Sequence, residues 1–126
     1  MHYHQDWIMR QIETAVALII HLITGKKSDS AMIEEFERTT SQWNPLYNKL
    51  HELVIQGQIC DAEDMLYEAI DHNDKNALKA AIFFYSEINK LSDAELEDNN
   101  FPRDEVLSGL QEVCRIYGIQ EDLFFE

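Results

Sequence analysis

The sequence predicts an all-α fold, a single helical domain over residues 1–126, and three observations favour it. Apolar residues make up 45% of the chain, and they recur at the spacing of one helix face. Only four glycines and two prolines interrupt the chain, so turns are few. No segment shows the alternation of apolar and polar residues that is typical of a half-buried strand.

The first two helices are expected over about residues 5–24 and 30–40. Ile8 and Ile12 begin the helical spacing of the first, and Gly25 supplies its stop. The second half of this helix is apolar on nearly every side, so neighbouring helices or another subunit must cover it. Serine and aspartate residues before the second helix offer N-caps, and the apolar stripe of this helix is narrower than that of the first.

The third and fourth helices are expected as a hairpin on either side of Gly57. Asn44 is a favourable N-cap, and Pro45 suits the first helical position, where its missing N–H costs nothing. The fourth helix follows after almost no loop, with Ala62 and Leu66 on its apolar face. A connection this short requires the two helices to be antiparallel.

The fifth helix is expected over about residues 74–91, and the sixth from Pro102 onward. Ser92 and Glu95 match a capping box for one short helical turn between them. The chain then forms about six helices as three stacked antiparallel hairpins: the first helix with the second, the third with the fourth, the fifth with the sixth. The apolar residues of segment 120–126 are expected to dock onto the body.

Small residues are expected where the central helices approach each other. Gly57, Ala62 and Ala69 would let the third helix pack closely on the fourth, and the fourth on the fifth. This segment resembles a tetratricopeptide repeat, because its apolar, turn and small positions stand at that family's spacing: Leu53, Gly57, Ile59, Ala62, Leu66 and Ala69. The resemblance implies a right-handed superhelix of stacked hairpins with a concave groove.

Two further stretches resemble a second group of proteins. QDWIMRQIE, near the start, and GQICDAEDMLYEAI, at the fourth helix, are similar to an uncharacterised family of small helical proteins from Gram-positive bacteria. That family has no assigned activity, so the resemblance implies a fold and a domain of unknown function.

The charge balance excludes several classes of partner. Ten Lys and Arg stand against twenty-four Asp and Glu, which gives a formal net charge of −14. Basic side chains this scattered cannot neutralise a phosphate track, so nucleic acid is not an expected partner. The acidic surface either serves solubility or receives a basic protein partner whose affinity falls with salt.

Membrane insertion and a disulfide framework are not expected either. The most apolar stretch, AVALIIHLI at residues 15–23, falls short of the roughly 20 apolar residues of a membrane span. Two cysteines, Cys60 and Cys114, with no signal-peptide pattern before them, indicate a reducing cytoplasm.

A protein-interaction or scaffold module is the expected function. The first helix of each hairpin would line a concave groove that takes an extended peptide or a helix. The tetratricopeptide resemblance implies groove residues on the third helix, and the fifth helix adds two more; together they are Asn44, Tyr47, His51, Val54, Lys79 and Phe83. The same side chains could instead pack against the first helix or the C-terminal segment, which would fill the groove.

Two alternatives stay open beside this one. A symmetric homodimer through the first helix would bury Trp7, Val16 and Ile20. A small helical enzyme, or a redox- or metal-responsive protein, would use Cys60 in the first turn of its helix with His51 of the same hairpin. A free cysteine is more often a small buried hydrophobe. No cofactor is expected, and no metal site, because closely spaced Cys and His ligands do not occur.

Overall fold

The computed structural model describes residues 2–25, 30–71 and 73–119, and this part of the chain contains seven α-helices and no strand. The helices are α1 (His2–Thr24), α2 (Ser30–Trp43), α3 (Pro45–Ile55), α4 (Ile59–Ala69), α5 (Lys75–Asn89), α6 (Asp93–Asp98) and α7 (Arg103–Ile116). The predicted all-α class is confirmed. The count is seven where about six were expected, because the short turn after Ser92 is a helix of its own. Segment 120–126, expected to dock onto the body, lies outside the described residues.

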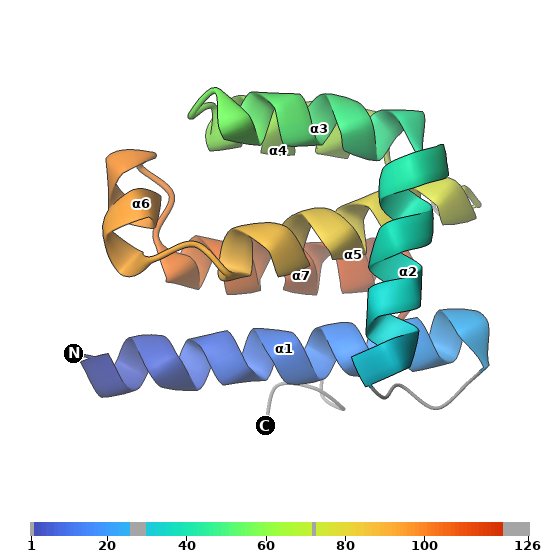
Figure 1. Cartoon of the computed structure of the whole chain (residues 1–126), viewed down its shortest axis with the longest axis horizontal. Helices are drawn as coiled ribbons and strands as arrows, with labels where there is room; N and C mark the ends of the chain where they lie inside the picture. The colour runs from blue at the N-terminus through green and yellow to red at the C-terminus, as the bar shows by residue number, and fades with distance from the viewer. Residues whose placement is uncertain (1, 26–29, 72, 120–126) are drawn as a thin grey trace.

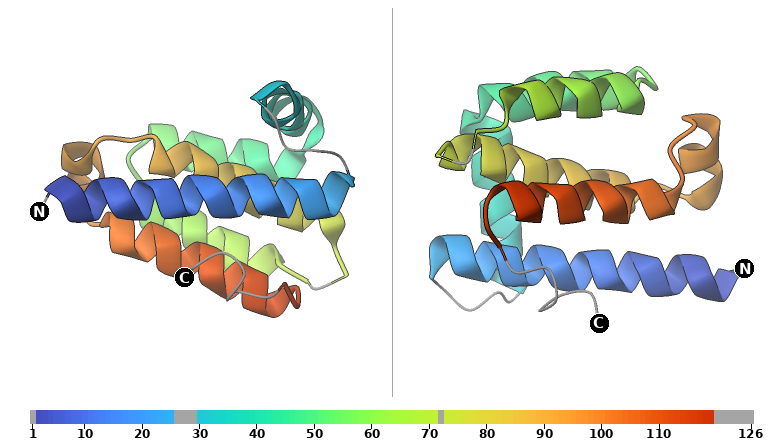
Figure 2. Two further views of the ribbon diagram at one scale, coloured as in Figure 1. Left: turned by 90° about the horizontal axis from the view of Figure 1, so that it is seen from below. Right: turned by 180° about the vertical axis from the view of Figure 1, so that it is seen from behind.

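The helices form three layers (Figure 1). The α3–α4 hairpin is the upper layer, α5 and α7 lie side by side in the middle, and α1 runs beneath them. Seen from below, α1 lies across both α5 and α7 (Figure 2). Helix α5 is therefore the centre of the fold, packed against α1, α2, α3, α4 and α7.

The first of the three predicted hairpins is wrong. Figure 1 shows α2 standing across the ends of α1 and α3 rather than lying antiparallel to α1. Helix α2 contacts α5 and α3 as well as α1, and its Phe36 is buried. The other two hairpins, α3 with α4 and α5 with α7, are present, and α6 is inserted in the second. A superhelix of three like hairpins is not confirmed by this arrangement.

Caps and turns follow the residues that predicted them. Asn44 Oδ1 accepts from the backbone N–H of Tyr47 at the start of α3. Ser92 and Glu95 form the expected capping box at α6. The glycines that follow α1, α3 and α7 have φ values of +70°, +75° and +73°, a conformation that favours glycine at a helix end. Local signals therefore set where the helices begin and end.

The small residues of the central hairpin have different roles. Ala62 is fully buried, as expected for close packing, but Ala69 is exposed, so its predicted helix contact is wrong. Gly57 is needed for the turn and not for close approach, because an added Cβ would meet nothing nearer than 3.6 Å. The glycine that permits a close helix approach is Gly109 of α7, where an added Cβ would lie 2.6 Å from Tyr85 Cε1.

Helix α1 has one face in the core and one face open. The stretch Asp6–Thr24 is long and apolar enough to cross a membrane by length and composition alone, a test that core helices of soluble proteins also pass. Val16 and Ile20, two of the three residues expected at a dimer interface, are 4% and 1% exposed and belong to the core. The open face instead carries Trp7 and Leu22, which are 52% and 59% exposed.

Candidate functional site

The structure divides the six predicted groove residues between a closed interface and an open recess. Four of them belong to α3 and its N-cap and two to α5, and these helices pack against each other. Asn44 and Tyr47 are both buried. Asn44 caps α3 and also donates from Nδ2 to the carbonyl of Asn76 at 2.8 Å, which ties α3 to the start of α5. These two residues hold the layers together and are closed to a partner.

The ring of Tyr47 fills the interface between α3 and α5. It stacks on Phe83 with centroids 4.2 Å apart and ring planes within 2° of each other. Val54, further along α3, is half-buried and packs against the core. The predicted groove between these helices is therefore occupied by its own side chains.

Glu87, one helical turn beyond Phe83, joins the two polar residues of α3. Its Oε2 accepts from the Tyr47 hydroxyl at 2.5 Å, and its Oε1 lies 2.5 Å from Nδ1 of His51. Burial, followed by the bond to Glu87 and its charge, raises the pKa of Tyr47 far above its ordinary value. Tyr47 is therefore a neutral hydrogen-bond donor at any physiological pH.

His51 is the accessible member of this cluster, with its side chain 42% exposed. If Glu87 is a carboxylate, which only accepts, the hydrogen between the two side chains is on Nδ1. Nε2 is then the nitrogen left for solvent or a ligand, as an acceptor when the ring is neutral and a donor when it is charged. A histidine oriented in this way can take a proton from a bound ligand.

Cys60 lies in different surroundings from His51. Its Sγ is 3.9 Å from the backbone oxygens of Asn99 and Asn100, beside the end of α6, whereas the His51 ring bonds residues of α3 and α5. Burial raises the pKa of the Cys60 thiol, and nearby acids, Glu105 first, raise it further. A thiolate nucleophile needs the opposite shift. The two residues on which the enzyme alternative depends are therefore not brought together.

An open recess of about 260 Å³ lies beside α2, where this helix faces α5. Its lining residues are Thr24, Met32, Glu35, Phe36, Thr39, Thr40 and Lys79. Lys79, one of the six predicted groove residues, is half-buried and forms no ion pair within the described ranges. A recess of this volume is smaller than most cofactor sites and suits one side chain of a partner.

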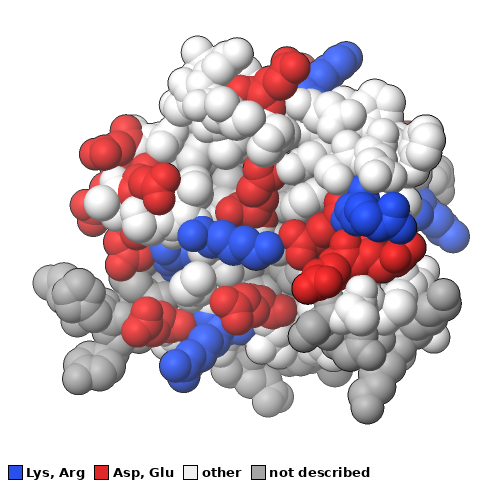
Figure 3. All heavy atoms as spheres, in the orientation of Figure 1, with Lys and Arg blue, Asp and Glu red and all other residues white. Residues whose placement is uncertain are grey.

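Charged residues of α2 border the recess. Glu35 pairs with Arg38 at 2.9 Å, Glu37 pairs with Lys90 of α5 at 3.1 Å, and Glu34 is exposed. Figure 3 shows acidic side chains in the majority on this face, with basic ones between them. A segment that enters the recess therefore meets one acid and one base in its lining, on a face where acidic side chains outnumber basic ones.

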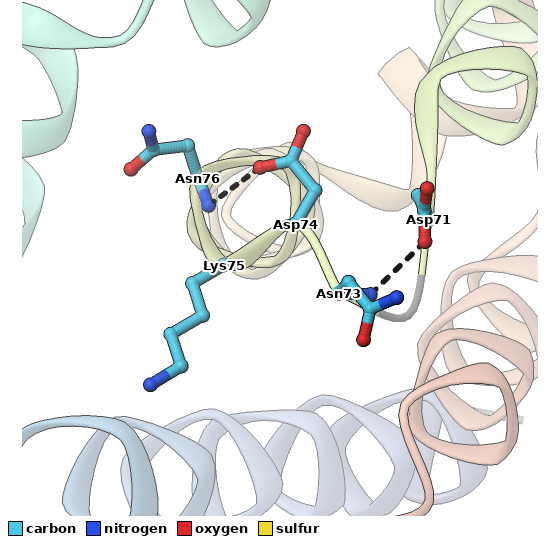
Figure 4. A pocket seen from close by; sticks show the side chains of 5 residues that line it. All are labelled: Asp71, Asn73, Asp74, Lys75 and Asn76. Carbon is cyan, nitrogen blue, oxygen red and sulfur yellow. Dashed lines mark hydrogen bonds between the residues drawn. The ribbon is translucent and has the colours of Figure 1, made fainter.

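A second hollow, open to solvent, lies over the loop between α4 and α5 (Figure 4). The loop's own backbone uses its carboxylates: Asp71 Oδ1 accepts from the N–H of Asn73, and Asp74 Oδ1 accepts from that of Asn76. Lys75 points away from both carboxylates. Within the described residues, no three His, Cys, Asp or Glu side chains gather closely enough to hold a metal ion.

Two parts of this region were missed in the sequence. Glu87 follows Lys79 and Phe83 at intervals of four residues, so its place on the same face of α5 was a usable signal. Met32 and Phe36 of the recess wall also stand four residues apart, but nothing in α2 itself indicates that it faces α5. The recess could therefore be found only from the tertiary structure.

These features define a small, acidic, all-α protein of three helical layers with a side-chain-sized recess beside α2. The chain belongs to the family of unknown function DUF6483, whose sequence model matches residues 2–118. No curated protein matches the chain, and no solved structure does. The family assignment confirms the predicted domain of unknown function and adds no activity.

Proposed function

We propose that this protein is a protein-interaction module that binds its partner through one apolar side chain held in the recess beside α2. The recess itself is the observation that carries the proposal: Met32 and Phe36 supply apolar wall, and Lys79 supplies an ammonium group outside any ion pair of the described residues. An apolar anchor buried there leaves water, which is the usual source of binding energy at an interface hot spot. The ammonium can donate to a carbonyl or carboxylate of the same segment.

The acidic surface around the recess suggests the chemistry that surrounds the anchor. Glu35 lines the recess, and the whole chain carries a formal charge of −14. We therefore expect a protein or peptide partner with basic residues beside its apolar anchor, and an affinity that falls with salt. Nucleic acid and membranes remain outside the expected ligands. The likeness of the α3–α4 hairpin to a tetratricopeptide repeat supports an interaction role, since such repeats serve as docking surfaces.

Two further expectations belong to this proposal. A cytoplasmic location follows from the cysteine content and is compatible with an interaction module. A homodimer through the open face of α1, which Trp7 marks, would add a second copy of the recess to one assembly. No cofactor is needed for either.

A recess-filling substitution tests the proposal. Thr39→Trp places an indole in the recess, whereas Thr14→Trp adds the same ring at an exposed position of α1. The probe is a set of peptides selected from a random library for binding to the unchanged protein, with affinities measured by fluorescence anisotropy at low and high salt. We expect the Thr39 variant to lose about tenfold or more in affinity, equivalent to about 1.4 kcal/mol, and the Thr14 variant to match the unchanged protein.

A second variant separates the two parts of the recess. Lys79→Met keeps an aliphatic stem but removes the charge, so we expect a smaller loss than that of Thr39→Trp. The docking assignment would be wrong if the selected peptides bound the Thr39 variant as tightly as the unchanged protein. It would also be wrong if they shared no apolar residue.

A further inference from the structure

A chain of four oxygen atoms joins α4, α5 and α7 away from the recess. Glu63 Oε2 lies 2.7 Å from the hydroxyl oxygen of Tyr85, which lies 3.2 Å from that of Tyr67. The Tyr67 hydroxyl in turn lies 3.2 Å from the backbone carbonyl oxygen of Gly109. Three helices are therefore connected through three hydrogen bonds in series.

Counting hydrogens along these four oxygens shows what three simultaneous hydrogen bonds require of the Glu63 carboxyl group. The Gly109 carbonyl can only accept, so the single hydroxyl hydrogen of Tyr67 is used on it. The Tyr67 oxygen must then accept from Tyr85, whose only hydrogen is used in turn. If all three contacts are filled, the Tyr85 oxygen accepts from Glu63, which requires that the carboxyl group carry a proton.

The side chains around these four oxygen atoms are closely packed. Tyr85 is fully buried, and a Cβ added at Gly109 would lie 2.6 Å from both Glu63 Oε2 and Tyr85 Cε1. An ionised Glu63 would accept from Tyr85 instead, and two hydroxyl hydrogens would then have to serve three contacts, because Tyr67 could turn toward Tyr85 only by leaving the Gly109 carbonyl. Ionisation therefore leaves one of the three contacts without a hydrogen bond.

The charges that face Glu63 favour the protonated form. Burial raises the pKa of Glu63, the bond from Tyr85 opposes this, and the acidic groups of Glu105 on α7 and Asp64 on α4 raise the pKa further. Helix α5 contributes Tyr85 to this set, and α3, the other helix packed on α4, contributes no charged group to it. Each charged neighbour in the set is thus an acid.

We propose that Glu63 is a proton-binding site, whose bound proton completes the hydrogen-bond chain to Gly109 and fastens α4 to α5 and α7. When the proton leaves, the carboxylate takes the hydrogen of Tyr85, and one of the two links beyond Tyr85, to Tyr67 or from Tyr67 to Gly109, breaks. The ligand is the proton itself, and its loss loosens α4 without removing a residue from the core. This site is independent of the recess, so either assignment can fail alone.

The sign of the pH dependence follows from the raised pKa of Glu63. A carboxyl group that is more easily protonated in the folded chain contributes stability that is fully present below its unfolded pKa. That contribution is lost as the pH rises through the folded pKa. Glu63→Gln removes the titration but keeps a donor for Tyr85, so this variant should gain stability over the unchanged protein as the pH rises.

Carboxyl titration by carbon NMR tests the proposal directly on the full chain. We expect the midpoint of Glu63 to lie above that of Glu68, an exposed glutamate of the same helix. Tyr67→Phe removes the acceptor that claims the hydrogen of Tyr85, so Tyr85 becomes free to donate to an ionised Glu63. The Glu63 midpoint should then fall toward that of Glu68.

The outcomes are decisive in both directions. A Glu63 midpoint at or below that of Glu68 in the unchanged protein would overturn the proposal. So would a raised midpoint that stayed the same in the Tyr67→Phe variant, because burial alone would then account for it. Unfolding by urea at several pH values adds the stability readout, with Glu68→Gln as the matched control for Glu63→Gln.

Discussion

Two tyrosine–glutamate pairs connect α5 to the upper layer, and they differ in where the proton lies. Tyr47 of α3 is 2.5 Å from Glu87, and Tyr85 of α5 is 2.7 Å from Glu63 of α4. The Tyr47 hydroxyl donates to Glu87, and the charge of Glu87 contributes to the raised pKa of Tyr47. Glu63 must donate if the chain beyond Tyr85 is complete. The same two side-chain types thus serve opposite roles on the two sides of α5.

The neighbours of each pair explain this difference. On the α3 side, Glu87 has an imidazole as a second hydrogen-bond partner, and Lys90 pairs with Glu37 nearby. On the α4 side, the charged groups that act on Glu63 are acids. A carboxyl group keeps its charge where donors surround it and keeps its proton where acids and acceptors do. The environment, and not the pair, decides the protonation state.

The largest predicted effect is at the close contact of the α4 side. Gly109→Ala places a methyl group against the hydroxyl of Tyr85 and the carboxyl of Glu63. Overpacking costs up to about 3 kcal/mol, and alanine is about 1 kcal/mol more favourable than glycine within a helix. We therefore expect a net loss of about 2 kcal/mol in the free energy of unfolding. Urea unfolding measures it, with Ser108→Ala, at an exposed position of the same helix, as the control. Equal stability of the two variants would contradict the close contact.

A smaller effect distinguishes the two glutamates by the same substitution. Glu87→Gln replaces a charged partner of Tyr47 and His51 with a neutral one, and hydrogen bonds to charged groups are the stronger, so we expect a loss of about 1 kcal/mol in unfolding free energy. Glu63→Gln keeps a donor for Tyr85 and should cost nothing at neutral pH. Both variants are compared by urea unfolding at one pH. If the two amides behaved alike, the contrast between the two sides of α5 would be lost.

Local structure could be predicted from the sequence because its causes are local. The cap at Asn44, the capping box of Ser92 and Glu95, and the glycine stops each depend on residues within one helical turn. The orientation of α2 depends instead on contacts with α3 and α5. Its residue Phe36 and Lys79 of α5 line one recess although they are far apart in the sequence.

The contacts of the candidate sites were likewise not predictable from local sequence. Tyr47 and His51 were selected from the sequence, but Glu87, which binds both, lies on another helix. Glu63 gave no signal at all, because an isolated glutamate on a helix is normally solvated. Its partner Tyr85 is 22 residues away. Polar contacts between layers are decided by packing, so a pattern within one helix cannot reveal them.

Alkaline titration tests whether the tyrosine hydroxyl groups of the two pairs both have a raised pKa. Burial is the largest cause of a raised pKa at Tyr47, Tyr67, Tyr85 and Tyr117 alike, so all four should stay neutral near pH 10, their ordinary value. A raised phenol pKa contributes stability that is present below the unfolded pKa and lost as pH rises through the folded one. The tyrosinate absorbance of these four of the five tyrosines should therefore rise together with loss of helical circular dichroism. A tyrosine that ionised before the helices unfolded in the unchanged protein, and was missing from the Tyr47→Phe variant, would be Tyr47 itself. The phenols of the two tyrosine–glutamate pairs would then not be alike.

The smallest predicted effect is the reactivity of Cys60, which shares the acidic surroundings of Glu63. Burial and then Glu105 raise the pKa of its thiol, so the thiolate is scarce at neutral pH and alkylation by iodoacetamide should be slower than for the same chain in urea. Glu105→Gln removes one acid and should speed the reaction, whereas Glu68→Gln should not. The buried Cys114 should react only after unfolding, which makes it an internal control for the folded state. Rapid labelling of Cys60 in the folded protein below neutral pH would mean that the pKa of its thiol is lowered and not raised. Acidic neighbours would then not dominate this side of α5, and the contrast with the Glu87 side would be wrong.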